Sequence, residues 1–431
     1  MEFVELTKKE FDKFEENHKQ SSFNQTSAWG ELKKCNGWTP MLLGLKDKKK
    51  VVAATLLLAK ELPIIHKKMF YAPRGFLIDY KNYDLLGEFT SKIKEYAKKN
   101  KGIFIKIDPY IPYKERDIDG KIVENGIDNE DAYKNLLKLG YHHFGFNVMQ
   151  ETLQPRWIFV TDTENKTVDE VMKGMDSKTR QIIRKNERLC IKTREIGYDE
   201  LDKFKDIMQR TGDRRKFIDR PLSYYQEMYK ALSPDGILKI LLAELHTKEL
   251  LKNLNHEKDS YQKEYDERKH KHDDGINKMN EKKYESKQKE TEKNIERVEK
   301  KIKEIKELNK KHGDVILLGG ILFLVHGNEV LSLVGGSYEE FMEFQSAYTV
   351  HWEGCKYAIE NGYKRYNFYG ITGDFREENP LYGLYLFKRG YGGRVVELIG
   401  EFDLVISKFW YHTYKCAFSL YHKIKNIKNR D

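Results

Sequence analysis

The chain has 431 residues, which is enough for two or three folding units with cores of their own. Charged residues make up 34% of the chain, and Lys plus Arg (78) exceed Asp plus Glu (68), giving a formal net charge of +10. This balance favours anionic partners such as nucleic acid, phosphates or an anionic membrane surface. The longest apolar runs, Val51–Ala59 and Ile316–Val325, are too short to form a membrane-spanning helix.

The beginning of the chain and the cysteines indicate a reducing, cytoplasmic compartment. The first residues mix acidic and basic side chains and contain no apolar segment of the kind that a secretory signal has. The four cysteines lie far apart and form no CxxC motif or Cys/His cluster, so the sequence suggests neither a zinc site nor a disulfide framework. We therefore expect a cytoplasmic protein without a structural metal.

The first predicted unit, residues 1–150, has the pattern of an α/β fold. Three apolar segments with the length and composition of strands are followed by an amphipathic helix and then by a further strand. In chain order these are Met41–Leu45, Val51–Ala59, Lys68–Ala72, the helix Tyr83–Asn100 and the strand Gly102–Pro109.

The second predicted unit, residues 151–246 and 313–400, repeats this order. It opens with a strand at Trp157–Val160, and later three strands again precede a helix and a strand. These are Ile237–Leu245, Ile316–Val325, Glu329–Val334, the helix Glu339–Asn361 and the strand Lys364–Gly370. Helices alternating with strands in this way predict an α/β (α+β) architecture built from two related units.

A basic helix is predicted within the second unit. Residues Met175–Arg194 have the pattern of a helix followed by a strand, and cationic side chains crowd the helix surface. The candidates for contact with phosphates are Lys178, Arg180, Arg184 and Lys185.

Residues 247–312 interrupt the second unit and are dominated by Lys and Glu. Ile295, Val298, Ile302 and Ile305 follow the 3-4-3 spacing of a coiled-coil seam. A turn signal at His272–Asn277 divides the segment, so we expect an antiparallel coiled-coil helical hairpin that protrudes from the body. The hairpin is either a solvated structural arm or an arm that contacts a large anionic partner, and its incomplete seam is also a surface for a homodimer.

The last segment, residues 401–431, mixes aromatic and basic side chains. We expect an amphipathic helix there. Such a helix either lies in a membrane interface as a peripheral contact or docks onto its own protein.

Common catalytic signatures are absent from the sequence. There is no Walker A loop, dinucleotide fingerprint, HExxH motif or GxSxG elbow. The loop Arg389–Arg394 resembles the pyrophosphate loop of acyl-CoA acetyltransferases, but it ends in Arg instead of Gly or Ala. The residues demand neither a cofactor nor a metal.

The residues are compatible with a group-transfer reaction in which the enzyme acts mainly by aligning two substrates. When an amine attacks an activated ester, the site has to align the reactants and to stabilise an oxyanion, for which one fixed donor contributes ~3–4 kcal/mol. Substrates that carry phosphate would require cations on rigid elements. The candidate residues near predicted element ends are Lys33, Asp108, Arg220 and Lys388.

The candidate residues lie in a series of sequence motifs that occur together in one protein family. In chain order they are SAWGELK (Ser27–Lys33), YAPRG (Tyr71–Gly75), IKIDPY (Ile105–Tyr110), SKTRQIIRKNE (Ser177–Glu187), TGDRRKFIDRPLSYY (Thr211–Tyr225) and LYLFKRGYGG (Leu384–Gly393). With the Glu/Lys hairpin among them, the sequence resembles the FemABX family of peptidoglycan interpeptide-bridge aminoacyltransferases, in particular its FemA-like members.

The resemblance implies two acetyltransferase-like (GNAT-type) domains and a reaction. An amino acid, with glycine favoured over serine or alanine, would move from aminoacyl-tRNA to the side-chain amine at position three of a peptidoglycan stem peptide. The acceptor would be lipid II at the inner membrane face or the soluble UDP-MurNAc-pentapeptide. No cofactor is implied.

The resemblance also implies roles for single residues. Lys33 and Arg220 would hold substrate phosphates, while Tyr224, Tyr110 and Arg74 would contact substrate. Lys388 would lie near the transferred carbonyl, and Asp108 or the substrate itself would accept the proton of the attacking amine.

Two alternatives are compatible with the same residues. One is an acyl-CoA-dependent N-acyltransferase, and the other is a non-catalytic adaptor for nucleic acid or membranes.

Overall fold

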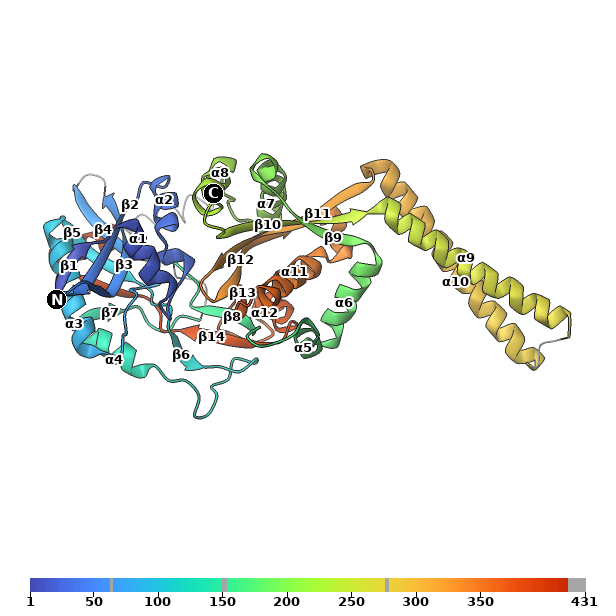
Figure 1. Ribbon diagram of the computed structural model, residues 1–431, viewed down its shortest axis with the longest axis horizontal. Helices are drawn as coiled ribbons and strands as arrows, with labels where there is room; N and C mark the ends of the chain where they lie inside the picture. Colours follow the sequence, from blue (N-terminus) through green and yellow to red (C-terminus); the bar gives the residue numbers. More distant parts are fainter. Residues whose placement is uncertain (63–64, 149–152, 276–278, 418–431) are drawn as a thin grey trace.

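The computed structural model describes residues 1–62, 65–148, 153–275 and 279–417, and it contains two mixed β-sheets that lie side by side (Figure 1). A two-helix arm projects from the second unit away from the first (Figure 1). Among the described residues, no helix is long and apolar enough to cross a membrane. The predicted α/β class, two units with an inserted helical hairpin, is confirmed.

The first sheet has seven strands in the order β1-β2-β3-β4-β5-β15-β7. Side chains of strand β3 alternate between two cores, because Leu56 and Leu58 pack toward one face while Leu57 and Ala59 pack toward the other. Helix α3 (Tyr83–Lys99) covers one face, and α1 (Lys8–Glu16) and α2 (Ser27–Lys34) cover the other. The strands are β1 (Glu2–Glu5), β2 (Thr39–Asp47), β3 (Lys50–Leu62), β4 (Lys67–Ala72), β5 (Gly102–Ile107), β7 (Tyr141–His143) and β15 (Phe402–Val405), and α4 (Glu130–Lys138) precedes β7.

The second sheet has eight strands in the order β6-β14-β8-β13-β12-β11-β10-β9. They are β6 (Pro112–Glu115), β8 (Trp157–Asp162), β9 (Ile191–Glu195), β10 (Leu238–His246), β11 (Val315–His326), β12 (Glu329–Ser337), β13 (Arg365–Gly370) and β14 (Arg394–Leu398). One face packs on α5 (Val168–Gly174), α6 (Ser177–Arg188), α11 (Ser346–Glu360) and α12 (Tyr382–Arg389). The other face packs on α7 (Leu201–Arg215) and α8 (Leu222–Leu232).

One hydrophobic core is shared by the two units. Phe204 of α7 and Leu322 of β11 belong to the same buried cluster as Phe11 of α1 and Trp29 of α2. Burial of this continuous apolar surface favours a fixed arrangement of the units.

Each sheet contains one parallel strand pair joined by a helical crossover. β4 and β5 are joined through α3 and stay paired from Lys68 to Ala72. β12 and β13 are joined through α11 and pair only at Glu329, Val330 and Leu331, after which the two strands diverge. The predicted repetition of strands, a helix and a further strand is therefore present. In both copies the last strand is parallel to its partner, but the two copies end differently.

The crossover helix of the second unit is shorter than predicted. The expected helix over 339–361 is divided into a 3-10 segment, Glu339–Phe344, and α11. Gln345 lies between them with a φ of 50°, in the left-handed region, which interrupts the helical hydrogen bonds.

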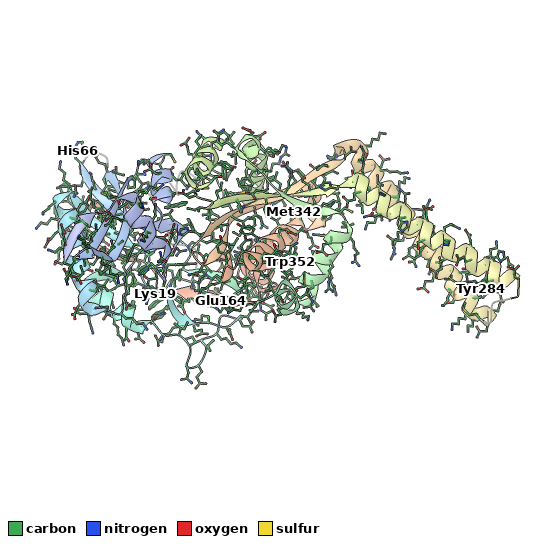
Figure 2. All side chains as sticks on the ribbon, in the orientation of Figure 1. Lys19, His66, Glu164, Tyr284, Met342 and Trp352 are labelled. Atoms are coloured by element: carbon green, nitrogen blue, oxygen red, sulfur yellow. The ribbon has the colours of Figure 1, made fainter. Side chains whose placement is uncertain are left out.

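The arm consists of α9 (Thr247–Asp273) and α10 (Glu281–His312), which run antiparallel (Figure 1). Close to the body the seam is apolar, with Leu254, Val298 and Ile302 buried. Farther out it becomes polar, and Tyr284 near the tip stacks on His272 at 3.8 Å (Figure 2). The apolar part therefore anchors the arm, while its outer part is held by weaker polar contacts.

Two short strands cross the predicted unit boundaries. β6, from the first predicted unit, pairs with β14 in the second sheet, and β15, beyond residue 400, pairs with β5 and β7 in the first. The predicted helix over 401–431 therefore begins later, since helical structure starts at Lys408 and is described as far as Ala417. Residues 418–431 lie outside the described residues.

Candidate functional site at the junction of the two units

Two neighbouring cations, Lys33 and Arg220, lie where α2 meets α8. Thr26 caps α2 by accepting a hydrogen bond from Trp29 N at 3.1 Å, and the Lys33 ammonium lies 4.0 Å from the centre of the Trp29 ring. Burial, together with the smaller effect of the nearby charge of Arg220, lowers the pKa of Lys33 to about 8. Within the described residues, no carboxylate lies within 4.0 Å of either cation. Two adjacent cations without a counter-charge favour binding of an anion.

Tyr224 lies beside this cation pair. Arg220 immediately precedes Pro221, the N-cap of α8, and its guanidinium carbon lies 5.3 Å from the centre of the Tyr224 ring. The structure therefore brings together three of the predicted substrate contacts, Lys33, Arg220 and Tyr224.

Lys388 lies at the divergence of β12 and β13. It belongs to α12, is only 7% exposed, and its ammonium donates to the backbone oxygens of Phe368 at 2.6 Å and Gly370 at 2.7 Å. Burial lowers the pKa of Lys388 to about 7. An ammonium has three donors, and in the described part of the chain no partner is found for the third.

The strand end that Lys388 holds has an unusual backbone. Tyr369, between the two bonded carbonyls, has a φ of 63°, and its N–H donates to Asn367 Oδ1 at 2.8 Å. The pairing of β13 with β8 is irregular between Asn367 and Gly370. Tyr369 and Tyr224 both pack against the core that the two units share.

His351 is the nearest titratable neighbour of Lys388 in α11. Burial lowers the pKa of His351 to about 3, and the charge of Lys388 acts in the same direction. Its Nδ1 lies 2.7 Å from the Tyr366 hydroxyl. A neutral imidazole beside Lys388 contributes no positive charge that would oppose the ammonium.

Asp108 and Arg74 form a buried ion pair at the end of β4 and β5. The Arg74 N–H donates to Asp108 Oδ1 at 2.8 Å, and Arg74 Nη1 lies 3.8 Å from Asp108 Oδ2. Burial raises the pKa of Asp108 to about 7 against the opposing charge of Arg74. The adjacent hollow has a volume of about 10 Å³, room for about one water molecule. Asp108 is therefore a buried carboxyl group, 4% exposed, beside a small hollow.

Tyr110 joins this ion pair to the second unit. The Arg74 guanidinium lies 5.0 Å from the centre of the Tyr110 ring. The Tyr110 hydroxyl donates to Glu329 at 2.9 Å and accepts from Asn367 Nδ2 at 3.0 Å. Arg365 Nε in turn donates to Glu329 at 2.8 Å. A buried polar network thus runs from Asp108 to the strand that Lys388 holds.

Glu329, Asn367 and Tyr369 were not among the predicted site residues. Glu329 and Asn367 occupy the first and last paired positions of the parallel strands, where a buried polar side chain is unusual. The sequence predicted both strands but not their parallel pairing, so it offered no signal for these residues.

The basic residues of α6 lie on the opposite face of the second sheet from the cation pair. Lys178, Arg184 and Lys185 are exposed, whereas Arg180 donates to the backbone oxygens of Lys173, at 3.1 Å, and Met175. Lys185 extends this basic surface toward the arm, because its charge adds to burial in lowering the pKa of Lys301 in α10. Within the described residues, none of these four side chains forms a hydrogen bond or ion pair with Lys33 or Arg220.

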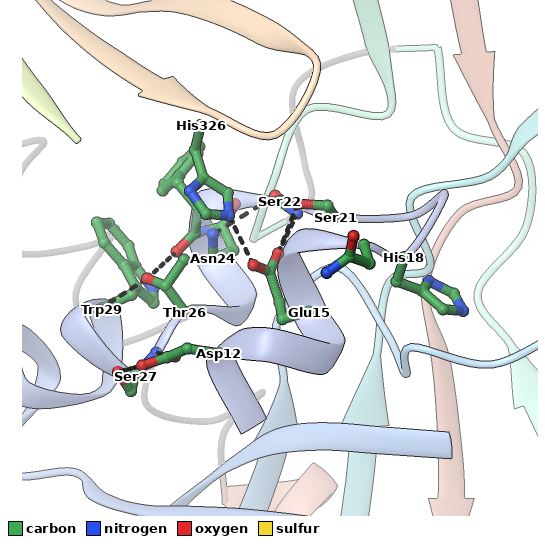
Figure 3. Close-up of polar contacts among 12 residues, drawn as sticks. Asp12, Glu15, His18, Ser21, Ser22, Asn24, Thr26, Ser27, Trp29 and His326 are labelled. Atoms are coloured by element: carbon green, nitrogen blue, oxygen red, sulfur yellow. Dashed lines mark hydrogen bonds and ion pairs between the residues drawn. The ribbon is translucent and has the colours of Figure 1, made fainter. Parts of the chain in front are cut away.

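A second polar contact fixes the junction. His326, the last residue of β11, has its Nε2 2.7 Å from Oε2 of the buried Glu15 in α1 (Figure 3). Glu15 Oε1 accepts from the Ser21 hydroxyl and the Ser22 N–H, both at 2.8 Å (Figure 3). The end of β11, just before the turn into β12, is therefore tied to the first unit.

A hollow of about 340 Å³ also lies between the units, lined by Lys19 of the first and Glu164 of the second (Figure 2). Its other walls carry the ion pairs Arg394–Asp162 and Arg365–Glu329. None of the predicted site residues lines it.

Comparison with known proteins identifies the family to which the chain is similar. The model of the FemAB family matches residues 6–419. Aminoacyltransferase FemA of Staphylococcus aureus strain bovine RF122 / ET3-1 and that of strain N315 are each 33% identical over 434 residues, covering 100% of this chain and 100% of the relative. A crystal structure of FemX has a TM-score of 0.82 at 28% identity and covers 96% of this chain and 99% of that one.

The fold and these relatives define an enzyme of the acyltransferase class. The chain belongs to the FemAB family. This confirms the family that the motifs predicted, while the roles assigned to single residues stay predictions.

Proposed function

We propose that the protein transfers an amino acid from aminoacyl-tRNA to the position-three side-chain amine of a peptidoglycan precursor. Glycine is the favoured donor, with serine and alanine as further candidates, and the acceptor is lipid II or the UDP-linked precursor. Membership of the FemAB family and the name aminoacyltransferase of its FemA relatives support this proposal.

The observation that carries the proposal is the buried ammonium of Lys388. Two of its donors are fixed by the carbonyls of Phe368 and Gly370, so the group is already oriented before a substrate arrives. The remaining donor is available to an oxygen that becomes negative during the reaction. A fixed donor of this kind acts in the transition state without a cost for reorganisation.

The reaction is balanced without a covalent enzyme intermediate. The neutral amine attacks the ester carbonyl, a C–N bond forms, and Lys388 stabilises the tetrahedral oxyanion. The C–O bond to the ribose then breaks, and the proton of the attacking nitrogen finally reaches the ribose oxygen. We assign the proton transfer to the substrate, because Asp108 is enclosed with Arg74. Loss of turnover by about 10²-fold in Asp108→Asn would reassign it to Asp108.

Lys33, Arg220 and Tyr224 are proposed to hold the acceptor. A pyrophosphate would supply the counter-charge that the two cations lack, with Tyr224 alongside. Tyr110 and Arg74 are proposed to hold the two units in a fixed relative position, through the contact of Arg74 with the Tyr110 ring and the hydrogen bond of Tyr110 to Glu329.

The exposed cations of α6 and the base of the arm are proposed to contact tRNA. Such a contact depends on phosphate charge and weakens as salt increases. The double change Arg184→Glu, Lys185→Glu is expected to reduce tRNA affinity about tenfold or more at low salt. Equal affinity of this variant and the unaltered protein would remove α6 from the tRNA surface.

Mass spectrometry of the precursor after incubation with a mixed pool of charged tRNAs tests the function. The expected product carries one added amino acid on the position-three residue and identifies the donor. Acetyl-CoA replaces the charged tRNA in a parallel reaction, and acetylation there without aminoacylation in the first reaction would contradict the proposal.

A further inference from the structure

The loop between α7 and α8 presents two apolar side chains to solvent. Ile218 is 97% exposed and Phe217 is 44% exposed. Both belong to the short connection Lys216–Pro221, and neither takes part in the transfer chemistry proposed above. An adjacent pair of exposed apolar residues on an otherwise charged protein indicates a contact surface.

The backbone of this loop is held in place. Lys216 ends α7 with a φ of 58°, and the Phe217 N–H donates to the Gly212 oxygen at 3.1 Å. Asp219 is fixed from two sides, by Lys205 at 2.6 Å and by the Tyr225 hydroxyl at 2.7 Å. These anchors fix the loop in a conformation in which the side chain of Ile218 points into solvent and stays uncovered.

The charges around the apolar pair are mainly positive. Residues 213–220 read DRRKFIDR, with four cations and two carboxylates, and one carboxylate, Asp219, is already paired with Lys205. Arg215, Lys216 and Arg220 are exposed on both sides of Phe217 and Ile218. Apolar side chains flanked by exposed cations complement a lipid surface with anionic headgroups.

We propose that the α7–α8 loop is a membrane-contact site, at which Phe217 and Ile218 insert between the headgroups of an anionic lipid surface while Arg215 and Lys216 bind those headgroups. Arg220, two residues from Ile218, belongs to the cation pair beside Tyr224, so the contact places that pair at the lipid surface. The lipid contact itself does not depend on which group the enzyme transfers.

Co-sedimentation of the full chain with phosphatidylcholine vesicles containing phosphatidylglycerol tests this site. We expect the double variant Phe217→Ser, Ile218→Ser to bind at least about tenfold more weakly than the unaltered chain, because each insertion buries apolar area. Ile122→Ser is the matched control, since Ile122 is 59% exposed on a different loop, and we expect its binding to be unchanged. Equal binding of the double variant and the unaltered chain, or no vesicle binding by the unaltered chain, would overturn the proposal.

A second measurement reports insertion directly. The variant Ile218→Trp is expected to show a blue-shifted emission with anionic vesicles and to be quenched by lipids brominated in their acyl chains, relative to the unaltered chain. Vesicle binding without either change would mean attachment by charge elsewhere and would contradict insertion of this loop.

Discussion

The two parallel strand pairs, β4–β5 and β12–β13, are each joined by a helical crossover, but they differ at the ends of their strands. β4 and β5 remain paired to Ala72 and Ile107, and the ion pair of Arg74 and Asp108 follows directly. β12 and β13 separate after Leu331, and the end of β13 is held by Lys388, which has no carboxylate within 4.0 Å in the described residues.

This difference separates a structural strand end from a reactive one. In the first unit the buried Asp108 carboxyl group has the opposite charge of Arg74 beside it, which opposes the increase in pKa that burial causes. In the second unit an ammonium is buried without a counter-ion, which lowers the pKa of Lys388 to about 7. Burial of an uncompensated charge is unfavourable for stability and is typical of functional sites. We call β12–β13, whose strands diverge, the open pair and β4–β5, whose strands stay together, the closed pair. We therefore place the chemistry at the open pair and a supporting role at the closed pair.

Removal of the ammonium at the open pair is expected to have the largest effect. We expect Lys388→Ala to lower kcat by about 10²–10³-fold, because one fixed donor to the oxyanion is lost, with little change in acceptor affinity. Single-turnover transfer at saturating substrates measures this. Lys364→Ala is the control, because Lys364 lies beside the start of β13 but is exposed and paired with Glu164. A turnover of Lys388→Ala close to that of the control would remove Lys388 from the chemistry.

Removal of the arginine at the closed pair should affect stability first. We expect Arg74→Met to lower the free energy of unfolding by about 3 kcal/mol, because it leaves the buried Asp108 carboxylate unpaired. The loss should be larger at pH 8 than at pH 5. Without Arg74 the folded-state pKa of Asp108 lies farther above its unfolded value, so deprotonation is increasingly unfavourable in the folded protein.

Urea denaturation at the two pH values measures this effect of Arg74. The exposed pair Arg210–Asp206 provides the control, and Arg210→Met should cost less than about 1 kcal/mol. If Arg74→Met and Arg210→Met cost the same, the closed strand end is not a structural element.

The cation pair should affect binding more than turnover. We expect Lys33→Ala and Arg220→Ala each to weaken binding of the UDP-linked precursor about tenfold and to change kcat less than about threefold, because charge-assisted bonds to phosphate are lost. Calorimetric titration measures the affinity. Lys34→Ala is a close control, since Lys34 is the next residue but is exposed and paired with Glu31. Unchanged affinity in both variants would withdraw the pair from the acceptor site.

The smallest expected effect concerns the contact that ties the end of β11 to the first unit. Burial tends to lower the pKa of His326, but the hydrogen bond to Glu15 and the charges of Glu15, Glu16 and Glu329 outweigh it and raise the pKa above its ordinary value. A raised folded-state pKa stabilises the fold fully below the unfolded pKa of ~6.5, and this stabilisation is lost as pH rises through the folded-state pKa.

We therefore expect His326→Gln to destabilise the protein by about 1 kcal/mol more at pH 6 than at pH 9. Thermal unfolding at the two pH values measures the difference, with the exposed His66→Gln as control. A cost for His326→Gln that is independent of pH would show that the charge of His326 does not hold the junction.

Much of the fold could be predicted from local pattern. The arm was expected over 247–312, and its helices occupy Thr247–Asp273 and Glu281–His312, because Lys/Glu composition and apolar spacing are local signals. The strands of both units also followed from their apolar runs. In contrast, β6 and β15 have four residues each and gain their place by pairing with distant strands, which no local pattern encodes.

The site was predictable only in part for a similar reason. Motif resemblance located Lys33, Arg220, Tyr224 and Lys388, and the structure places the first three together. The network of Glu329, Asn367 and Tyr369 depends on where β12 and β13 separate and on a bulge at Tyr369. Register and bulges result from tertiary packing, so the polar connection between the two strand ends could be found only in three dimensions.

The position of the Lys388 ammonium in a substrate complex tests the central claim most directly. A crystal structure of the full chain with a non-hydrolysable amide analogue of the aminoacyl-tRNA 3′ end would locate the transferred carbonyl. The account predicts that the carbonyl oxygen lies about 3 Å from Lys388 Nζ, accepting the third hydrogen of an ammonium still bonded to Phe368 and Gly370. An analogue bound at the junction with its carbonyl out of reach of Lys388 would contradict it.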